Sequence, residues 1–362
     1  MKIILRVASY VLLSILLLVF SNFTAAEMAL FIQALAKKAT AAEAQKTTVV
    51  SGKDGWLFFA PELRSMSVGQ FWGDAAPRVS RASNPEFADP LPAILDFKAQ
   101  LDRAGIELIF VPIPAKATIY PEMISEHGDT TARTDRYHLK FYDILREQGV
   151  NVLDLTPLFL KNRFTDAGPI YCKQDTHWSG QGCVLAAAAI AEVIGAPSWM
   201  VEIPKRHKNH DASQSERKPV LDNGQNRAGT PIVKKNEITG DLWKALGDEN
   251  LQKEQLRLTY IKEGVSASWR ASPVVLLGDS HNLVFHAGAD MHAQGAGLPD
   301  HLAHQLGFPV DVVAVRGSGA TPSRLNLYRR RDNMKGKRVV VWCLSVREFT
   351  EGQGWRLVPV IR

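Results

Sequence analysis

The stretch PVVLLGDSHN, residues 273–282, contains the features that decide the fold. Its uninterrupted apolar run is typical of a short strand that is buried on both faces. Gly278 and Asp279 end this run, and a helix-like stretch begins near Ser280. A strand that leads directly into a helix is typical of α/β proteins, in which ligands bind at the carboxyl ends of the strands.

Similar patterns recur through a chain of 362 residues, of which 46% are hydrophobic and 22% are charged. Further apolar runs that predict strands lie at 107–112, 150–155, 310–315 and 338–344. Helical patterns that end near a glycine lie at 91–104, 137–148 and 179–194. Because short apolar strands alternate with helices, we predict an α/β fold with a mainly parallel central sheet covered on both faces.

Ser280 is a candidate nucleophile. A serine at a strand-to-helix turn lies at the carboxyl edge of the sheet. Its hydroxyl also faces a helix N-terminus, whose free N–H groups can stabilise a developing oxyanion. The alternative is a serine that only caps the helix.

A serine nucleophile needs a general base and an acid that orients the base. The segment YCKQDTHWSGQGC, residues 171–183, places Asp175 and His177 close together before a predicted helix. We therefore predict that Asp175, His177 and Ser280 form a catalytic triad. The alternative for the first two residues is a capped turn that contains a hydrogen-bonded structural histidine.

The loop RGSGAT, residues 316–321, follows the fourth predicted strand. Its glycines, Gly317 and Gly319, allow backbone N–H groups to approach a ligand closely. Together with Gly278 and Arg316 they are candidate residues for binding the oxyanion or the substrate. The spacing does not fit a phosphate-binding P-loop, and a tight turn between a strand and a helix is the alternative.

Several histidines lie near or beyond the candidate serine. His281 is adjacent to Ser280, and we expect it to form part of the pocket wall. The others could in principle share a metal ion with Asp290: His286, His292, His301 and His304. No recognised ligand spacing is present, so we predict no metal site.

The N-terminal region, residues 1–26, has a basic start, an apolar run and a small-residue cleavage site. This pattern is typical of a secretory signal peptide, and an uncleaved N-terminal anchor is the alternative. Residues 27–48 are rich in Ala and Lys and predict a helical linker. A single domain at 49–362 would follow, with a polar insertion near 203–238.

If the protein is exported, its cysteines could form a disulfide. In an oxidising compartment Cys172 and Cys183 could form a disulfide around the predicted Asp-His pair, and we expect this bond. The alternative is two buried free thiols. Cys343 lies in an apolar run and is expected to be buried in a strand.

The net charge of +6 is modest, and much of the excess lies in the polar insertion. The insertion could be a solvated surface segment or a patch that attracts an anionic polymer. We predict no binding of nucleic acid, because the chain has no motif for it.

Four blocks of sequence, taken together and in this order, resemble the alginate O-acetyltransferase family. They are KDGWLF at 53–58, DTHWS at 175–179, GDS at 278–280, and a late block with Trp342 and REF at 347–349. The resemblance covers roughly residues 51–355 and is greater to the J type of alginate O-acetylase than to its relative, the X type. No C-terminal carbohydrate-binding domain is evident in the sequence, which favours the J type.

This resemblance implies an SGNH-hydrolase-like α/β/α sandwich. Ser280 would be the nucleophile, His177 the general base and Asp175 its orienting acid. The reaction implied is the transfer of acetyl groups to hydroxyls of an exopolysaccharide, alginate first of all, through an acyl-enzyme. The resemblance implies no soluble cofactor.

The resemblance also implies a periplasmic location, with tethering to the inner membrane if the N-terminal segment is not cleaved. The expected partners are an anionic, alginate-like exopolysaccharide, a membrane-bound O-acyltransferase as acetyl donor, and other exopolysaccharide export proteins. Two alternatives stay open. The protein could be a polysaccharide acetylesterase that uses the same triad, or a non-catalytic polysaccharide-binding subunit of an export complex.

Overall fold

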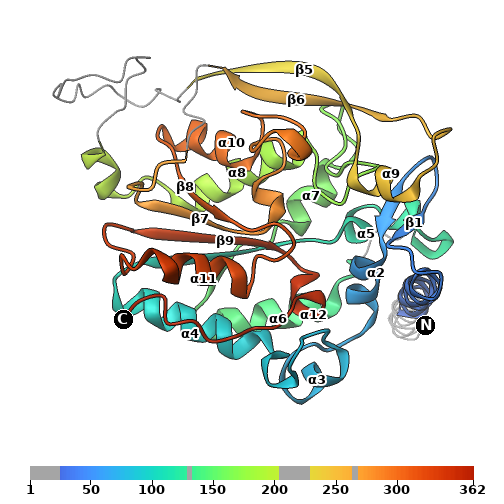
Figure 1. The fold of residues 1–362 in the computed structure, drawn as a ribbon, viewed down its shortest axis with the longest axis horizontal. Helices are drawn as coiled ribbons and strands as arrows, with labels where there is room; N and C mark the ends of the chain where they lie inside the picture. Colours follow the sequence, from blue (N-terminus) through green and yellow to red (C-terminus); the bar gives the residue numbers. More distant parts are fainter. Residues whose placement is uncertain (1–24, 129–132, 204–228, 263–267) are drawn as a thin grey trace, which may run out of the picture.

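The computed structural model describes residues 25–128, 133–203, 229–262 and 268–362 (Figure 1). Five parallel strands form the central sheet in the order β4-β3-β9-β7-β8. Their bounds are β3 Glu107–Ile113, β4 Asn151–Val152, β7 Val274–Gly278, β8 Asp311–Ala314 and β9 Val339–Ser345. All five apolar runs lie in this sheet, so the predicted α/β fold with a parallel central sheet is confirmed.

Helices cover both faces of the sheet (Figure 1). On one side lie α4 Pro90–Arg103, α6 Arg136–Glu147 and α11 Thr321–Arg330. On the other side lie α7 Thr156–Asn162, α8 Gly180–Ile194 and α10 Leu298–Leu306. The three helices predicted from the sequence correspond to α4, α6 and α8.

Short helices occupy many of the connections. The α-helical ones are α2 Ala60–Ser67, α3 Ala76–Val79, α5 Lys116–Ile119, α9 Asp241–Leu246 and α12 Glu348–Glu351. The 3₁₀ turns are η1 Gly73–Ala75, η2 Pro85–Phe87, η3 Pro121–Met123, η4 Glu126–Gly128, η5 Ser198–Glu202, η6 Ser280–Asn282 and η7 Ala289–Met291. The site described below lies among α9, η6 and η7.

Trp342 of β9 is the centre of the aromatic layer on the α4 side of the sheet. It is fully buried, and its ring lies 5.3 Å from that of Phe97 and 5.4 Å from that of Phe110. The indole Nε1 donates to the carbonyl oxygen of Gly319 at 2.9 Å. This hydrogen bond fixes the glycine-rich loop to the central strand, because a buried indole N–H needs an acceptor.

Two antiparallel pairs of strands lie outside the central sheet. β1 Val49–Ser51 pairs with β2 Leu57–Phe59, and the turn between them contains Asp54 and Gly55, both with positive φ. β5 Thr230–Ile238 pairs with β6 Glu254–Lys262 (Figure 1). β5 is the described end of the predicted polar insertion, while residues 204–228 lie outside the described residues.

Residues 25–44 are helical, and this helix packs on the domain through buried side chains that include Phe31 and Leu35. Almost all of the predicted signal or anchor at 1–26 lies outside the described residues. Within the part of the chain that is described, no helix combines the length and apolar character needed to cross a membrane.

The close approach of two central strands gives a first testable prediction. A Cβ on Gly278 would lie 1.7 Å from the carbonyl oxygen of Cys343, and the backbone of β9 cannot move without breaking the sheet. We expect Gly278→Ala to lower the free energy of unfolding in urea by about 3 kcal/mol or more, the upper end of overpacking. The control is Gly105→Ala, where φ is +67° and no atom would meet the Cβ. Its cost should be about 1 kcal/mol, and equal effects of the two variants would contradict the prediction.

Candidate active site

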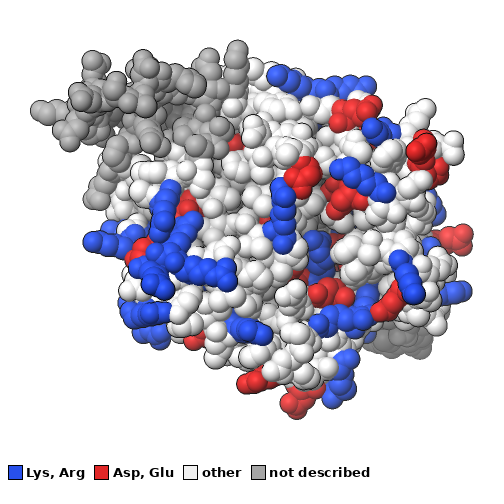
Figure 2. Space-filling view, in the orientation of Figure 1, with Lys and Arg blue, Asp and Glu red and all other residues white. Residues whose placement is uncertain are grey.

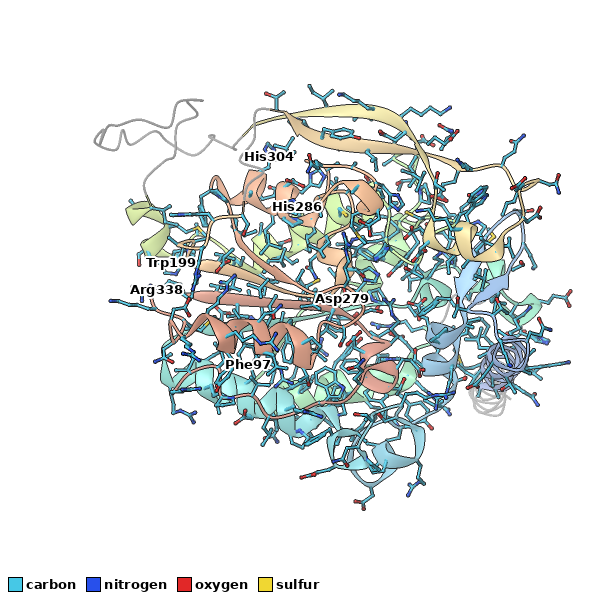
Figure 3. All side chains as sticks on the ribbon, in the orientation of Figure 1. Phe97, Trp199, Asp279, His286, His304 and Arg338 are labelled. Atoms are coloured by element: carbon cyan, nitrogen blue, oxygen red, sulfur yellow. The ribbon has the colours of Figure 1, made fainter. Side chains whose placement is uncertain are left out.

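Ser280 lies at the carboxyl end of the central strand β7, at the first position of η6. The preceding residue, Asp279, holds this end of the sheet together. Its Oδ1 accepts from the backbone N–H of His281 at 2.9 Å, and its Oδ2 accepts from that of Ser345, at the end of β9, at 2.8 Å. Figure 3 shows Asp279 at one end of the sheet and Arg338 at the other. The serine is therefore at the edge that the sequence predicted.

Asp175 and His177 lie on a turn that is closed by a β-bridge between Tyr171 and Trp178. The Oδ1 atom of Asp175 accepts from the backbone N–H of His177 at 3.0 Å. The same oxygen lies 2.6 Å from the imidazole Nδ1. Ser179 then caps α8 by accepting from backbone N–H groups of its first turn. The cap and the bridge leave the histidine ring facing η6.

The three predicted residues meet in one hydrogen-bonded chain. The Nε2 atom of His177 lies 2.8 Å from the Oγ of Ser280, and both residues are buried. An ionised carboxylate can only accept hydrogen bonds, so Nδ1 of His177 carries the proton that faces Asp175. This leaves Nε2 with a free lone pair toward the serine hydroxyl, which is the arrangement a general base needs.

Charge and burial act in opposite directions on this pair. Burial favours the neutral form of Asp175, but the charge of His177 and the hydrogen bonds from His177 and His292 hold the pKa of this carboxyl well below its usual range. Burial would also lower the pKa of His177, but the charge of Asp175 and the hydrogen bond to it outweigh burial and raise this pKa. The carboxylate is therefore ionised at neutral pH and stabilises an imidazolium on His177.

Two residues that the sequence analysis did not assign to the site complete the surroundings of Asp175. The backbone N–H of Asp241, at the start of α9, donates to Oδ2 of Asp175 at 2.9 Å. The Nε2 of His292 lies 2.9 Å from the same oxygen. The carboxylate of Asp241 accepts in turn from the backbone N–H and the hydroxyl of Thr176, at 2.8 and 2.6 Å. Neither role had a signal in the sequence, because Asp241 contacts Asp175 through its backbone N–H and His292 was considered only as a metal ligand.

A buried lysine supports the same turn from below. The Nζ of Lys116 donates to the carbonyl oxygens of Leu57 and Asp175, at 2.9 and 2.5 Å. The backbone N–H of Lys116 donates to Glu62, which also lies 3.7 Å from Arg347. Burial lowers the pKa of Lys116, although nearby acidic groups oppose this. These contacts fix the backbone from which the Asp175 side chain extends.

His281 packs beside His177, the histidine of the hydrogen-bonded chain. Its ring centroid lies 4.8 Å from that of His177 and 5.5 Å from that of Trp178. Burial lowers the pKa of His281 to about 4, although Asp279 opposes this effect. The ring is therefore neutral at neutral pH and does not repel a protonated His177. The ring lies next to His177, while its expected role in the wall of a pocket stays a prediction.

The predicted glycine loop packs directly on the end of β7. A Cβ on Gly319 would lie 2.6 Å from the backbone nitrogen of Asp279 and 2.7 Å from the carbonyl carbon of Gly278. Gly317 has a positive φ of 86° and open space around it. Arg316 forms an exposed ion pair with Asp290 at 2.7 Å. The loop thus lies beside the serine turn, while the roles of these residues in binding an oxyanion or substrate stay predictions.

The later histidines have separate environments. His286 forms a hydrogen bond with Asp300 at 3.0 Å, and burial lowers the pKa of His301 to about 4. Figure 3 shows His286 and His304 in the region of α10. Within the described ranges, the group of atoms close enough to share a cation belongs instead to Asp175, His177 and Asp241. The atoms of that group already form hydrogen bonds with one another or with neighbouring N–H and hydroxyl groups.

The expected disulfide between Cys172 and Cys183 is wrong for this structure, in which both cysteines are free and buried. The thiol of Cys172 donates to the carbonyl oxygen of Trp178 at 3.5 Å. The thiol of Cys183 interacts with the backbone of Leu298 in α10. Both sulfurs therefore serve as small buried groups that pack around α8.

A buried acid behind the glycine loop gives a pH-dependent prediction. Burial, together with the charge of Asp279, raises the pKa of Glu348 from 4.5 to about 7, although Ser318 donates to its carboxyl group. Because this pKa is higher in the folded than in the unfolded protein, the protonated carboxyl of Glu348 adds to the free energy of unfolding. This contribution is complete below pH 4.5 and is lost as the pH rises through about 7. Glu348→Gln stays neutral, so its stability relative to the wild type should rise over this interval by roughly 3 kcal/mol.

Urea unfolding at pH 5 and pH 8 measures this difference. The matched control is Glu249→Gln, which changes an exposed glutamate in the same way. The difference in free energy of unfolding between the wild type and the control should be the same at both pH values. A Glu348→Gln curve that runs parallel to the wild type at both pH values would contradict the assigned environment.

The family described as the SGNH hydrolase-like domain of the acetyltransferase AlgX matches residues 49–346 of the chain. The probable alginate O-acetylase AlgJ of Pseudomonas aeruginosa is 31% identical over 162 residues, which are 44% of this chain and 36% of that protein. The corresponding protein of Pseudomonas fluorescens is 24% identical over 315 residues, 86% of this chain and 68% of its own length. The match thus spans about a third of the P. aeruginosa relative.

Two solved structures are similar in fold. The O-acetyltransferase domain of Pseudomonas putida AlgJ has a TM-score of 0.58 at 22% identity, over 84% of this chain and 92% of that one. Pseudomonas aeruginosa AlgX has a TM-score of 0.54 at 17% identity, over 84% of this chain and 67% of that one. The predicted SGNH-hydrolase-like fold is therefore confirmed. The family match covers most of the length of this chain. The chain therefore belongs to the alginate O-acetyltransferase family and carries the SGNH-hydrolase-like acetyltransferase domain of that family.

Proposed function

We propose that this protein transfers acetyl groups to hydroxyls of an exopolysaccharide, with alginate as the first acceptor to test, through an acyl-enzyme on Ser280. In this proposal His177 is the general base and Asp175 orients it. The observation that carries the proposal is the chain of short hydrogen bonds from Asp175 through His177 to Ser280, at 2.6 and 2.8 Å. We choose acetyl as the transferred group because the chain belongs to an acetyltransferase family.

In the first step the Oγ of Ser280 attacks the carbonyl carbon of an acetyl ester or thioester. The hydroxyl proton moves to Nε2 of His177, and the negative charge goes to the carbonyl oxygen. The backbone N–H of Ser280 and the Gly317–Gly319 loop are the proposed oxyanion donors. The bond to the leaving group then breaks, and His177 returns the proton to that group. An acetyl-serine remains.

In the second step a sugar hydroxyl takes the place of the leaving group. His177 accepts the hydroxyl proton, and the sugar oxygen attacks the acetyl carbon. The serine oxygen leaves and recovers its proton from His177, which restores the triad and produces an acetylated sugar. Water in place of the sugar would produce acetate, so the efficiency of transfer depends on how well a bound polymer excludes water.

The charge on the β5–β6 hairpin supports an anionic acceptor. Lys235 of β5 lies directly opposite Arg257 of β6, and both side chains are exposed. Like charges in such a pair are unfavourable in the free protein, and an anion that binds both removes the repulsion. Figure 2 shows Lys and Arg side chains along the edge of the molecule over this hairpin.

The same proposal includes a location and partners. We place the reaction in the periplasm, with the N-terminal segment as a signal peptide or as a tether to the inner membrane. A membrane-bound O-acyltransferase would deliver the acetyl group, and other exopolysaccharide export proteins would deliver the polymer. These elements rest on the resemblance to the family and on the basic and apolar pattern of the first 26 residues.

Substitution of the nucleophile tests the reaction directly. The full chain is incubated with a chromogenic acetyl ester and an acetyl-free polyuronate, and ester cleavage and polymer-bound acetate are measured together. Ser280→Ala should lower both signals at least about 1,000-fold, because it removes the hydroxyl on which the proposed acetyl ester forms. His177→Ala should cause a similar loss.

The matched control is Ser272→Ala, at the other end of β7, where the serine accepts from the backbone N–H of Val274. This variant should retain activity. Acetate on the polymer that depends on Ser280 supports the transferase, whereas release of all acetate to water indicates an esterase. Activity that survives in Ser280→Ala would refute the assigned nucleophile, and inactivity of the wild type would favour a non-catalytic subunit.

The pH dependence tests the assigned base. His177 must be neutral to accept the serine proton, and Asp175 raises its pKa against the effect of burial. The value of kcat/KM for ester cleavage should therefore rise with pH, with a midpoint above 6.5, the ordinary value for histidine. A midpoint below 6.5 would contradict the proposed pairing.

A further inference from the structure

His292 is held in an unusual backbone conformation next to the site. Its φ and ψ are 71° and −53°, and the N–H of Ala293 donates to the carbonyl oxygen of Met291 at 2.9 Å. This is a γ-turn with positive φ at its centre, a rare and strained turn. A non-glycine residue keeps such a conformation only where its surroundings impose it, and such residues are concentrated at functional sites.

The loop around the γ-turn provides these surroundings. The N–H of Phe285 also donates to the carbonyl oxygen of Met291, at 2.8 Å, and the N–H of Gly288 donates to that of Ala293, at 2.9 Å. The Phe285 ring lies 5.7 Å from the ring of His292. The loop thus fixes both the backbone and the plane of the imidazole.

The orientation of His292 allows its side chain to contact Asp175. Its Nε2 lies 2.9 Å from Oδ2 of Asp175, and the two side chains are 10% and 2% exposed. The carboxylate can only accept, so Nε2 carries the proton. Oδ1 of Asp175 is occupied by two N–H groups of His177, while Oδ2 accepts from Asp241 and His292. His292 is thus the second histidine on one carboxylate.

We propose that His292 is a positioning residue that extends the triad to a chain of four groups, Ser280, His177, Asp175 and His292. This inference rests on the proposed function, because it assigns His292 to the same reaction. The N–H of His292 prevents rotation of the carboxylate about χ2. Oδ1 therefore stays in line with Nδ1 of His177, and Nε2 of His177 stays in line with the serine. A small misplacement of catalytic groups can reduce a rate about 100-fold.

Two carboxylates of the described residues lie on the Asp175 side of His292. Asp175 faces its ring directly from the 175–177 turn, and Asp241 of α9 lies on the other side of that carboxylate. On the histidine's own loop, Asp290 is paired with Arg316. The proposed effect of His292 therefore passes through Asp175, which allows a specific test.

The experiment compares three variants of the full chain. Asn tolerates a positive φ well, so His292→Asn keeps the strained backbone, but its shorter side chain cannot reach Asp175. Gln is long enough to place an amide N–H near Oδ2, so His292→Gln should restore part of the function. The matched control is His286→Gln, the same substitution at a histidine that lies near η7 and bonds to Asp300 instead of Asp175.

Two measurements are made on each variant, namely kcat and KM for the chromogenic acetyl ester, and the low-field proton NMR signal of the Nδ1 proton that His177 shares with Asp175. His292→Asn should lower kcat about 10- to 100-fold with little change in KM, and should shift or broaden the proton signal. His292→Gln should recover part of both, and His286→Gln should retain both. A purely structural role would reduce the amount of folded protein but leave the NMR signal of the folded fraction unchanged.

A double-mutant cycle with Asp175→Asn completes the test, since the effect of His292→Asn should vanish in that background. An unchanged kcat and an unmoved proton signal in His292→Asn would overturn the inference. If His292→Asn does not fold, the decision falls to His292→Gln, which must then differ from the wild type in kcat and in the proton signal. Failure of the proposed function looks different, because Ser280→Ala would then remain active or the wild type would itself be inactive.

Discussion

A buried carboxylate must be surrounded by hydrogen-bond donors, and the arrangement of this site follows from how Asp175 meets that requirement. An ionised group taken out of water is costly unless it is paired and fully hydrogen-bonded. Asp175 obtains its donors from His177, from the start of α9 and from His292. Three segments that are far apart in the sequence therefore have to converge on one side chain, and this convergence fixes His177, the proposed base, in front of the serine.

The central sheet provides the rigid surface against which these segments meet. β7 and β9 end side by side, and Asp279 joins the two ends through its hydrogen bond to Ser345. Gly278 and Gly319 allow the strands and the loop to come closer than any side chain would permit. A site that depends on hydrogen bonds of 2.6 and 2.8 Å needs such a support, because a displacement of about 1 Å would take both pairs of atoms out of hydrogen-bonding range.

The sequence was sufficient to predict the parts of the molecule that depend on local pattern. Apolar runs identified all five central strands, because strands buried on both faces leave no room for polar residues. Ser280 was recognisable because it lies at the turn from a strand into a helical segment, and Asp175 and His177 because they lie close together shortly before a predicted helix. β5 was missed because most of its positions are exposed or polar. β6 does alternate buried and exposed residues over 254–258, but it lies outside the runs of wholly apolar residues from which strands were predicted.

The contributions of Asp241 and His292 could not be predicted in this way. Asp241 acts through its backbone N–H, which every residue other than proline possesses, so its identity carries no signal. His292 was noticed, but a histidine can bind a metal, donate a hydrogen bond or pack in a core, and only tertiary contacts distinguish these roles. The disulfide failed for a similar reason. The disulfide was predicted because an exported protein meets an oxidising solvent. Both thiols, however, are buried and free in the structure.

The two Asp-Xaa-His turns show most clearly why environment decides function. In both turns the aspartate Oδ1 accepts from the backbone N–H and from Nδ1 of the histidine two residues later. Nevertheless, the pKa of His177 is raised while that of His281 is lowered to about 4. Burial lowers both, and what differs is the balance of neighbouring charges. Asp241 also raises the pKa of His177, whereas the charge of His177 lowers that of His281, and Arg347 lowers the pKa of both histidines. The same local motif thus holds His177, the proposed base, within reach of the serine in one turn, and a neutral histidine in the other.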